Sequence, residues 1–241
     1  MKLPAQLKVK IFADGADLKG IATLAANPLI KGFTTNPTLM RKAGITDYRA
    51  FALDVLKIIG NRPVSFEVFS DDFVEMEKQA RVIAAWGKNV YVKIPVTNTK
   101  GEFPAELIRR LAKAGVQLNV TALTTNEQVK VVLDCLSPET ASCISVFAGR
   151  VADTGRDPLP LMAEAVKIMS SNSKAELIWA SPRELLNIFH AEQIGCHIIT
   201  VTHDILGKLA LVGKDLGEYS LDTVKMFHND ATAAGFKIET A

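Results

Sequence analysis

Residues 89–97 read Asn-Val-Tyr-Val-Lys-Ile-Pro-Val-Thr, a short run of mostly apolar residues that contains one lysine, Lys93. Such a run, rich in β-branched residues and bounded by turns, is typical of a strand buried on both faces of a parallel sheet. Burial disfavours the charged form of a lysine, and a free amine is the nucleophile that forms Schiff bases with carbonyl compounds. Alternatively, Lys93 extends its charged end past the strand into water. Both interpretations are open for this stretch alone.

The same unit, a short apolar strand followed by a polar turn and an amphipathic helical stretch, recurs eight times along the chain. We expect strands at residues 9–14, 32–35, 64–69, 89–96, 117–123, 142–149, 176–181 and 196–203. Alternating strands and helices require a parallel sheet, and eight units in 241 residues predict an α/β fold of the (β/α)₈ TIM barrel type. No G-x-G-x-x-G or Walker sequence favours an open doubly wound sheet instead.

Residues that commonly begin helices follow the expected strands. They are Asp17, Asp47, Asp71 and Asp157-Pro158, with the capping boxes Thr124-x-x-Glu127 and Ser181-x-x-Glu184. Residues 220–241 remain after the eighth unit and have the pattern of one more helix with a polar end. We therefore expect a single barrel domain over residues 1–241, with residues 220–241 as its C-terminal helix and tail.

The composition argues against several classes of protein. The 28 basic and 26 acidic residues are interspersed and give a net charge of +2, unlike the basic surface of a nucleic-acid-binding protein. No apolar run approaches the roughly 18 residues of a membrane span, and the N-terminus lacks the apolar core of a signal peptide, so we expect a cytoplasmic protein with no membrane partner. The three cysteines and four histidines show no zinc-binding spacing, and we expect neither a metal nor another cofactor.

Polar residues recur at every second position of several expected strands, which is unusual because both faces of a barrel strand are covered. By parity, the inward-facing residues are Asp14, Ser65, Glu67, Phe69, Tyr91, Lys93, Gln117, Asn119, Thr121, Ser145, Phe147 and Gly149. Those that converge at the C-terminal mouth, where barrel enzymes carry their active sites, are Asp14, Glu67, Lys93, Asn119 and Thr121. Any one of them could cap a turn, but three charges together are costly to desolvate unless paired or functional. We therefore infer an active site at this mouth.

Two arginines follow later strands, in Gly149-Arg150 and Ser181-Pro182-Arg183. A helix that begins at Ser181 would offer unpaired N–H groups to an anion, and barrels frequently bind phosphate near strands seven and eight. Arginine adds a bidentate fork for phosphate. The ordinary alternatives are a helix cap for Ser181 and solvated charges for the arginines, but their position favours a phosphate site. We assign His203, at the end of the last strand, to packing or capping and leave it out of the site.

These residues resemble the transaldolases, a family of Schiff-base-forming aldol enzymes with a (β/α)₈ barrel, over most of the chain. The resemblance rests on motifs around the second, fourth and first strands: Gly32-Phe33-Thr34-Thr35-Asn36-Pro37-Thr38, Val92-Lys93-Ile94-Pro95-Val96 and Phe12-Ala13-Asp14-Gly15-Ala16-Asp17. It implies catalytic roles for Lys93, Asp14, Glu67 and Thr121, and substrate contacts by Thr34, Asn36, Asn119, Phe147, Arg150, Ser181 and Arg183.

The resemblance also implies a reaction. Lys93 would attack the ketone of a sugar phosphate, and Glu67, through a water held with Thr121, would move the proton that allows the iminium to form. Asp14 would accept the C4 hydroxyl proton as the carbon–carbon bond breaks. A three-carbon dihydroxyacetone enamine would stay on the lysine until an aldose phosphate takes it. The implied partners are small ketose and aldose phosphates, as in the pentose phosphate pathway.

A fructose-6-phosphate aldolase-like reaction is the alternative among enzymes, and a non-catalytic sugar-phosphate-binding barrel is the alternative outside them. Aldolase-like members tend to have glutamine at the Glu67 position and tyrosine at the Phe147 position, so this sequence favours transfer. The intact Lys93 argues against a binding protein. Pro182 replaces a usual aromatic residue and removes an N–H near the proposed phosphate, and Trp179 precedes the motif. The length resembles that of the short members, often ring-shaped, so we expect a homo-oligomer.

Overall fold

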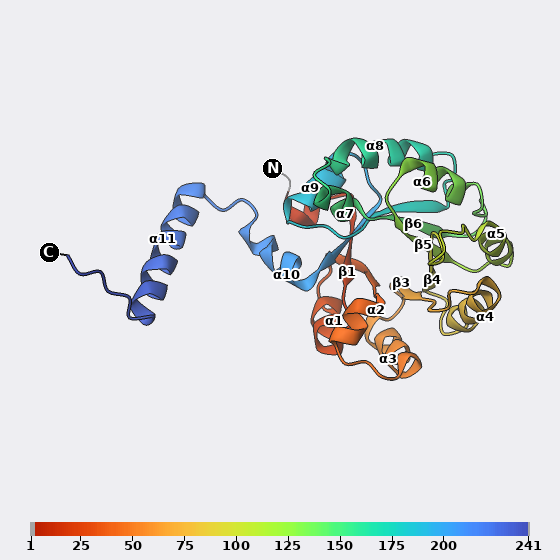
Figure 1. The fold of residues 1–241 in the computed structure, drawn as a ribbon, viewed down its shortest axis with the longest axis horizontal. Helices are drawn as coiled ribbons and strands as arrows, with labels where there is room; N and C mark the ends of the chain where they lie inside the picture. The colour runs from red at the N-terminus through yellow and green to blue at the C-terminus, as the bar shows by residue number, and fades with distance from the viewer. Residues whose placement is uncertain (1–2, 241) are drawn as a thin grey trace.

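Eight parallel strands close into a barrel in the computed structural model of the chain, which describes residues 3–240 (Figure 1). The strands follow one another around the barrel in chain order, so the predicted (β/α)₈ fold is confirmed. They are β1 (Lys10–Asp14), β2 (Ile30–Thr34), β3 (Val64–Glu67), β4 (Val90–Pro95), β5 (Leu118–Leu123), β6 (Ser142–Val146), β7 (Ala175–Trp179) and β8 (Ile198–Thr202).

Most of the helices surround the barrel and place their apolar side chains against it (Figure 1). The helices of the described residues are α1 (Leu18–Ala25), α2 (Pro37–Lys42), α3 (Tyr48–Ile59), α4 (Phe73–Ala84), α5 (Ala105–Lys113), α6 (Asn126–Leu133), α7 (Ala148–Asp153), α8 (Pro158–Met169), α9 (Leu186–Gln193), α10 (His203–Leu206) and α11 (Leu216–Ala233), with the 3₁₀ turns η1 (Pro4–Gln6) and η2 (Gly207–Leu211). Asp17, Asp47 and Asp157 cap α1, α3 and α8 through their carboxylates, as predicted.

The other predicted helix starts are displaced. Asp72, not Asp71, caps α4, because the Asp71 carboxylate accepts hydrogen bonds from Thr99 instead. The capping box of α6 is formed by Thr125 and Gln128, one residue after the predicted pair. The box predicted at Ser181 does not form, since Ser181 has a φ of 58° and α9 begins only at Leu186. An N-cap residue needs a φ in the extended region, which Ser181 does not have.

Three inward positions predicted by parity are wrong because the strands are shorter than expected. β3 ends at Glu67, and Phe69 is 52% exposed with its ring 4.7 Å from that of Tyr48. β6 ends at Val146, which leaves Gly149 in α7. Gln117 precedes β5, and its side chain donates to the Lys88 carbonyl.

The two faces of the strands contact two different cores. Outward residues such as Phe66, Val92 and Leu177 are fully buried in the large core that lies between strands and helices. Inside the barrel a smaller cluster, made of Phe12, Cys143, Ile178, Ala180 and Ile198, packs against Tyr91 and Phe147. The polar inward residues predicted from the sequence lie nearer the C-terminal ends of the strands. This arrangement places an apolar floor beneath a polar chamber.

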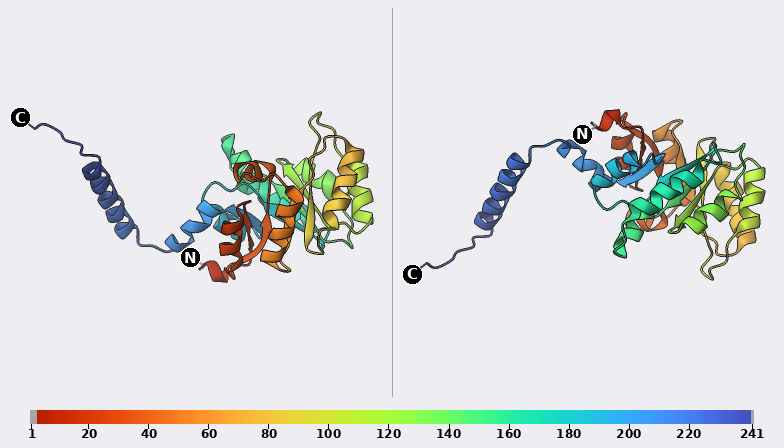
Figure 2. Two further views of the ribbon diagram at one scale, coloured as in Figure 1. Left: turned by 90° about the horizontal axis from the view of Figure 1, so that it is seen from below. Right: turned by 90° about the horizontal axis from the view of Figure 1, so that it is seen from above.

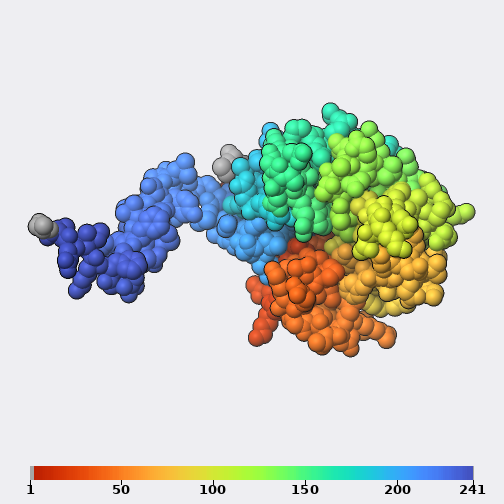
Figure 3. All heavy atoms as spheres, viewed as in Figure 1, coloured from red at the N-terminus to blue at the C-terminus, as the bar shows by residue number. Residues whose placement is uncertain are grey.

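After η2 the chain leaves the barrel and forms α11, which projects away from the rest of the molecule (Figures 2 and 3). The helix begins at Leu216, whereas the sequence predicts that the C-terminal helix and tail begin at residue 220. It has no buried residue, and apolar side chains such as Leu216 and Phe227 are mostly exposed. Within residues 3–240, no helix combines the length and the apolar character that a membrane span requires.

Candidate active site

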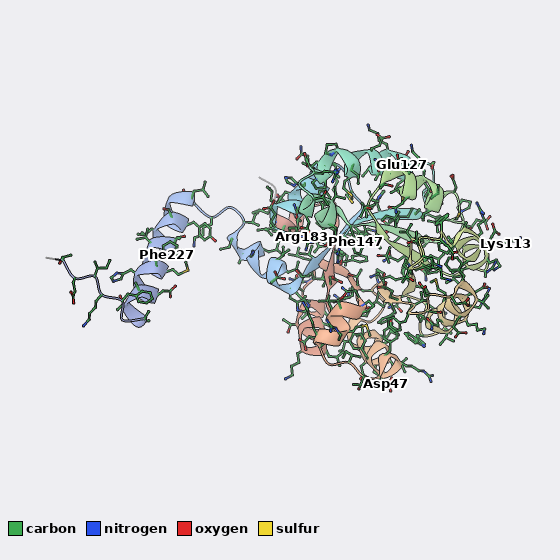
Figure 4. The ribbon with its side chains drawn as sticks, in the orientation of Figure 1. Asp47, Lys113, Glu127, Phe147, Arg183 and Phe227 are labelled. Atoms are coloured by element: carbon green, nitrogen blue, oxygen red, sulfur yellow. The ribbon has the colours of Figure 1, made fainter. Side chains whose placement is uncertain are left out.

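A cavity of about 620 Å³ opens at the C-terminal ends of the strands. Its wall contains all the residues that the sequence predicts for the site, namely Asp14, Thr34, Asn36, Glu67, Lys93, Asn119, Thr121, Phe147, Arg150, Ser181 and Arg183. In Figure 4, Phe147 lies near the middle of the barrel and Arg183 to its left, whereas Lys113 lies at the outer edge. The structure therefore brings the whole predicted set to one chamber.

Lys93 lies on β4 between two inward neighbours, because the sheet register pairs it with Glu67 on β3 and with Asn119 on β5. It is 6% exposed, so the interpretation that its charged end extends into water is wrong. Its Nζ donates to the Thr35 carbonyl at 3.0 Å and lies 3.1 Å from Oε2 of Glu67. An amine, a carboxylate and an open chamber thus meet at one point.

Asp14 is the last residue of β1 and lines the same cavity as Lys93. Thr34 donates to its Oδ1 at 2.8 Å and Asn36 to its Oδ2 at 3.3 Å, while the Thr34 hydroxyl also contacts that of Thr200 at 2.5 Å. Burial raises the pKa of Asp14 above its usual value, and the nearby Lys93 charge and the hydrogen bonds lower it only in part. A carboxylate with a raised pKa is better matched to proton transfer near neutral pH than an ordinary aspartate.

Asn119 is completely buried, and both ends of its amide are held. Its Nδ2 donates to Ser65 Oγ at 2.9 Å, and its Oδ1 accepts from Ser145 Oγ at 2.7 Å. The neighbouring Thr121 hydroxyl is also buried but has no hydrogen-bond partner within residues 3–240. Because a buried hydroxyl without a partner is costly, Thr121 is suited to hold a water or substrate oxygen.

The backbone after Thr121 departs from regular strand geometry and brings Ala122 into the cavity wall. The β5–β6 register shifts between Val120 and Leu123, and Ala122 has a φ of 68°. Such bulges re-aim side chains, and positive φ at a non-glycine residue is strained. Nothing in the sequence signals this irregularity.

The proposed phosphate side of the cavity is built by α7 and the turn after β7. Gly149 lies so close to this turn that an added Cβ would be 1.5 Å from the Ser181 carbonyl oxygen. Arg183 Nε donates to the Gly149 carbonyl at 3.4 Å, and its Nη2 pairs with Asp153. Arg150 is exposed, with its guanidinium carbon 5.9 Å from the Phe147 ring centre.

The predicted helix start at Ser181 is wrong, and this changes the argument for anion binding there. The turn residues Ser181 and Pro182 line the cavity, but α9 begins at Leu186. No helix dipole is therefore directed into the cavity from Ser181, and near this turn Arg150 and Arg183 are the cationic side chains of the wall. Trp179 is completely buried and is not part of the cavity wall.

Several wall residues were not predicted. They are Pro37, Thr38, Leu39, Lys42, Ala122, Ala180, Pro182, Thr200, Thr202, Asp204 and Ile205. The alternation Ile198, Thr200, Thr202 on β8 carries the same parity signal as the other strands and identifies the two threonines. His203 is not in the wall and packs against Gly15 and Gly20, in agreement with its exclusion from the predicted site.

Comparison with known proteins adds an independent line of evidence. Residues 11–239 match a family described as transaldolase/fructose-6-phosphate aldolase. A probable transaldolase from Dehalococcoides mccartyi is 36% identical over 82% of this chain and 88% of its own length. A probable transaldolase from Thermoanaerobacter is 32% identical over 95% of this chain and 100% of its own length. A crystal structure of a putative lyase/mutase from Burkholderia cenocepacia is similar in fold, with a TM-score of 0.59, 14% identity, and coverage of 86% of this chain and 80% of that one.

Proposed function

Because the chain belongs to the transaldolase/fructose-6-phosphate aldolase family, we propose that it transfers a three-carbon dihydroxyacetone unit from a ketose phosphate to an aldose phosphate through a Schiff base on Lys93. One observation carries this proposal: the buried Lys93 amine faces the cavity, 3.1 Å from the Glu67 carboxylate. A buried amine next to a proton-transfer group is what Schiff-base chemistry requires.

The first half of the reaction joins the donor to the enzyme. The Lys93 amine attacks the ketone carbon and gives a carbinolamine. Glu67 accepts a proton from Lys93 as the amine becomes the nucleophile and then returns it to the carbinolamine hydroxyl. The hydroxyl leaves as water, and the iminium remains. The Thr121 hydroxyl lies on the strand next to Lys93 and has no hydrogen-bond partner among residues 3–240, which supports a water-mediated path for this proton.

The second half breaks and remakes a carbon–carbon bond. Asp14 takes the C4 hydroxyl proton, the C3–C4 bond breaks, and its electron pair flows into the iminium to give an enamine and a free aldehyde. Asn36 and Asn119 would bind the hydroxyls of the enamine, and their position in the cavity wall supports this role. The enamine then adds to the aldehyde carbon of an aldose phosphate, Asp14 returns its proton, and hydrolysis frees the new ketose and Lys93.

Phe147 supports transfer over simple aldol cleavage. To release a free ketone, the enamine must be protonated, and a phenylalanine in the cavity wall offers no proton where a tyrosine would. The enamine would therefore persist until an acceptor aldehyde arrives. Aldol cleavage is the second candidate and would be favoured by a proton donor at this position.

Two measurements test the proposal. Borohydride with fructose 6-phosphate should trap a stable adduct on Lys93, located by peptide mass spectrometry. Fructose 6-phosphate should be consumed beyond one equivalent only when an aldose phosphate such as erythrose 4-phosphate is present. No adduct on any lysine would refute the Schiff base, and steady consumption without an acceptor would identify an aldolase.

The phosphate of the donor is expected to contact Arg150. Replacing Arg150 with glutamine should lower kcat/KM for fructose 6-phosphate about 10- to 100-fold, the cost of losing a hydrogen bond to a charged group. Borohydride trapping with fructose, which has no phosphate, should be unchanged. Arg156→Gln is the matched control, because Arg156 is exposed and outside the cavity wall. An equal loss with both sugars would contradict phosphate binding by Arg150.

The exposed α11 supports a homo-oligomer as a further part of the proposal. Its side chains Leu216 and Phe227 are 80% and 63% exposed, and Phe236, which follows the helix, is 78% exposed. Contiguous exposed apolar surface of this kind commonly marks an interface. Sedimentation velocity should give a mass of several chains, and a monomer at micromolar concentration would contradict this part.

A further inference from the structure

Tyr48, the first residue of α3, makes two hydrogen bonds to the backbone of Glu67. The Glu67 N–H donates to the phenol oxygen at 2.7 Å, and the phenol donates to the Glu67 carbonyl at 3.0 Å. Tyr48 is not in the wall of the active-site cavity, so it has no direct access to the substrate. The phenol nevertheless holds the residue that carries the carboxylate next to Lys93.

The hydrogen bond from the Glu67 N–H to Tyr48 replaces a bond that the sheet would otherwise form between β2 and β3. Between β2 and β3 the Thr35 N–H donates to the Ser65 carbonyl, and in a parallel ladder the next bond runs from the Glu67 N–H to the Thr35 carbonyl. Here the Glu67 N–H donates to Tyr48 instead. The Thr35 carbonyl accepts from the Lys93 Nζ at 3.0 Å.

The phenol is held rigidly in this position. The Tyr48 ring lies edge-on to Phe66 and Trp86, with centres 6.1 Å and 5.4 Å away, and 4.7 Å from the Phe69 ring. Burial raises the pKa of Tyr48 well above its usual value, so the phenol stays neutral and keeps its proton for the Glu67 carbonyl. The ring packing and the two hydrogen bonds fix the end of β3 from outside the barrel.

We propose that Tyr48 is a positioning residue for the Schiff-base lysine: by bonding to the backbone of Glu67, it keeps the Thr35 carbonyl free for Lys93 and fixes the Glu67 carboxylate beside the amine. The inference rests on the proposed function, because it assumes that Lys93 and Glu67 act together on the carbonyl substrate. Without the phenol, the Glu67 N–H would turn to the Thr35 carbonyl and compete with Lys93 for it.

Tyr48→Phe tests this role, since it removes the hydroxyl and keeps the ring. We expect kcat, and the single-turnover rate of borohydride-trappable adduct, to fall between about 10- and 100-fold, the scale of loss when catalytic groups are displaced. KM for the ketose phosphate should stay within about threefold, because the groups that bind the substrate are untouched. Asp47→Ala is the matched control, because Asp47 directly precedes Tyr48. This substitution removes the cap of α3, in which the Asp47 carboxylate accepts a hydrogen bond from the Ala50 N–H. It should lower thermal stability but leave kcat unchanged.

The outcomes separate this inference from the proposed function. An unchanged kcat in folded Tyr48→Phe, or an equal fall in Asp47→Ala, would overturn the role of Tyr48 while the Schiff base stands. Failure to trap an adduct in the wild-type protein would overturn the proposed function first. If Tyr48→Phe does not fold, a crystal structure of the wild-type protein decides: a hydrogen bond from Glu67 N–H to the Thr35 carbonyl would refute the inference, and one to Tyr48 with Lys93 on Thr35 would support it.

Discussion

Lys93→Met is expected to abolish the aldol reaction, with a loss of at least about 10⁴-fold, while the protein folds normally. The covalent intermediate needs the amine, and nothing else in the chamber can replace it: Lys42, the other lysine of the cavity wall, is exposed, whereas Lys93 is paired with Glu67 in the interior. Methionine has a similar length and no charge to desolvate, so it can fill the space that the lysine side chain occupies.

The loss should come from chemistry and not from unfolding. Removing Lys93 leaves the Glu67 carboxylate without its partner, but that side chain is 17% exposed and can still contact water. We therefore expect a thermal unfolding midpoint close to that of the wild type, together with no borohydride-trapped adduct. Lys113→Met, on the outer helix α5, is the control and should keep full activity. An adduct that still forms in Lys93→Met would place the Schiff base elsewhere.

The sequence was sufficient for the fold and for the strand residues that meet around Lys93, because both depend on side-chain periodicity. Alternation with a period of two is a property of the strand itself, so it identifies which face Glu67, Lys93 and Asn119 share before any partner strand is known. The sheet register then brings these three residues side by side. A strand that is polar toward the inside is rare enough in a parallel barrel to indicate a site.

Features that depend on the backbone were not predictable in this way. The Thr35 carbonyl contacts Lys93, and the carbonyl of Ser181 packs against Gly149, yet every residue has a carbonyl and the sequence marks neither. The positive φ values of Ala122 and Ser181 arise from tertiary contacts, since neither residue type favours them. Strand ends were misjudged for the same reason: Phe69 fits the alternation of β3, but the chain turns away after Glu67.

Asp14→Asn is expected to lower kcat by about 10²- to 10⁴-fold, the usual contribution of a general base. The asparagine can still accept from Thr34 but cannot take the C4 hydroxyl proton. Adduct formation on Lys93 should persist, because that step precedes the one in which Asp14 acts. To check this, the rate of product formation and the amount of borohydride-trapped adduct are both measured for Asp14→Asn and for the wild type. If trapping and turnover fell together, Asp14 would serve Schiff-base formation and not bond cleavage.

The same substitution should make the protein more stable near neutral pH, and the sign follows from the raised pKa of Asp14. Because the folded protein holds this proton more tightly than the unfolded chain, stability falls as the pH rises from the ordinary value of 3.8 through the raised one. Asparagine has no such dependence. Urea unfolding should therefore show a gain for Asp14→Asn that is larger near pH 7 than near pH 4. If Asp14→Asn were instead less stable than the wild type, by a difference in unfolding free energy that grew with pH, Lys93 would stabilise the Asp14 charge more than burial disfavours it. The ionised carboxylate would then not destabilise the folded protein.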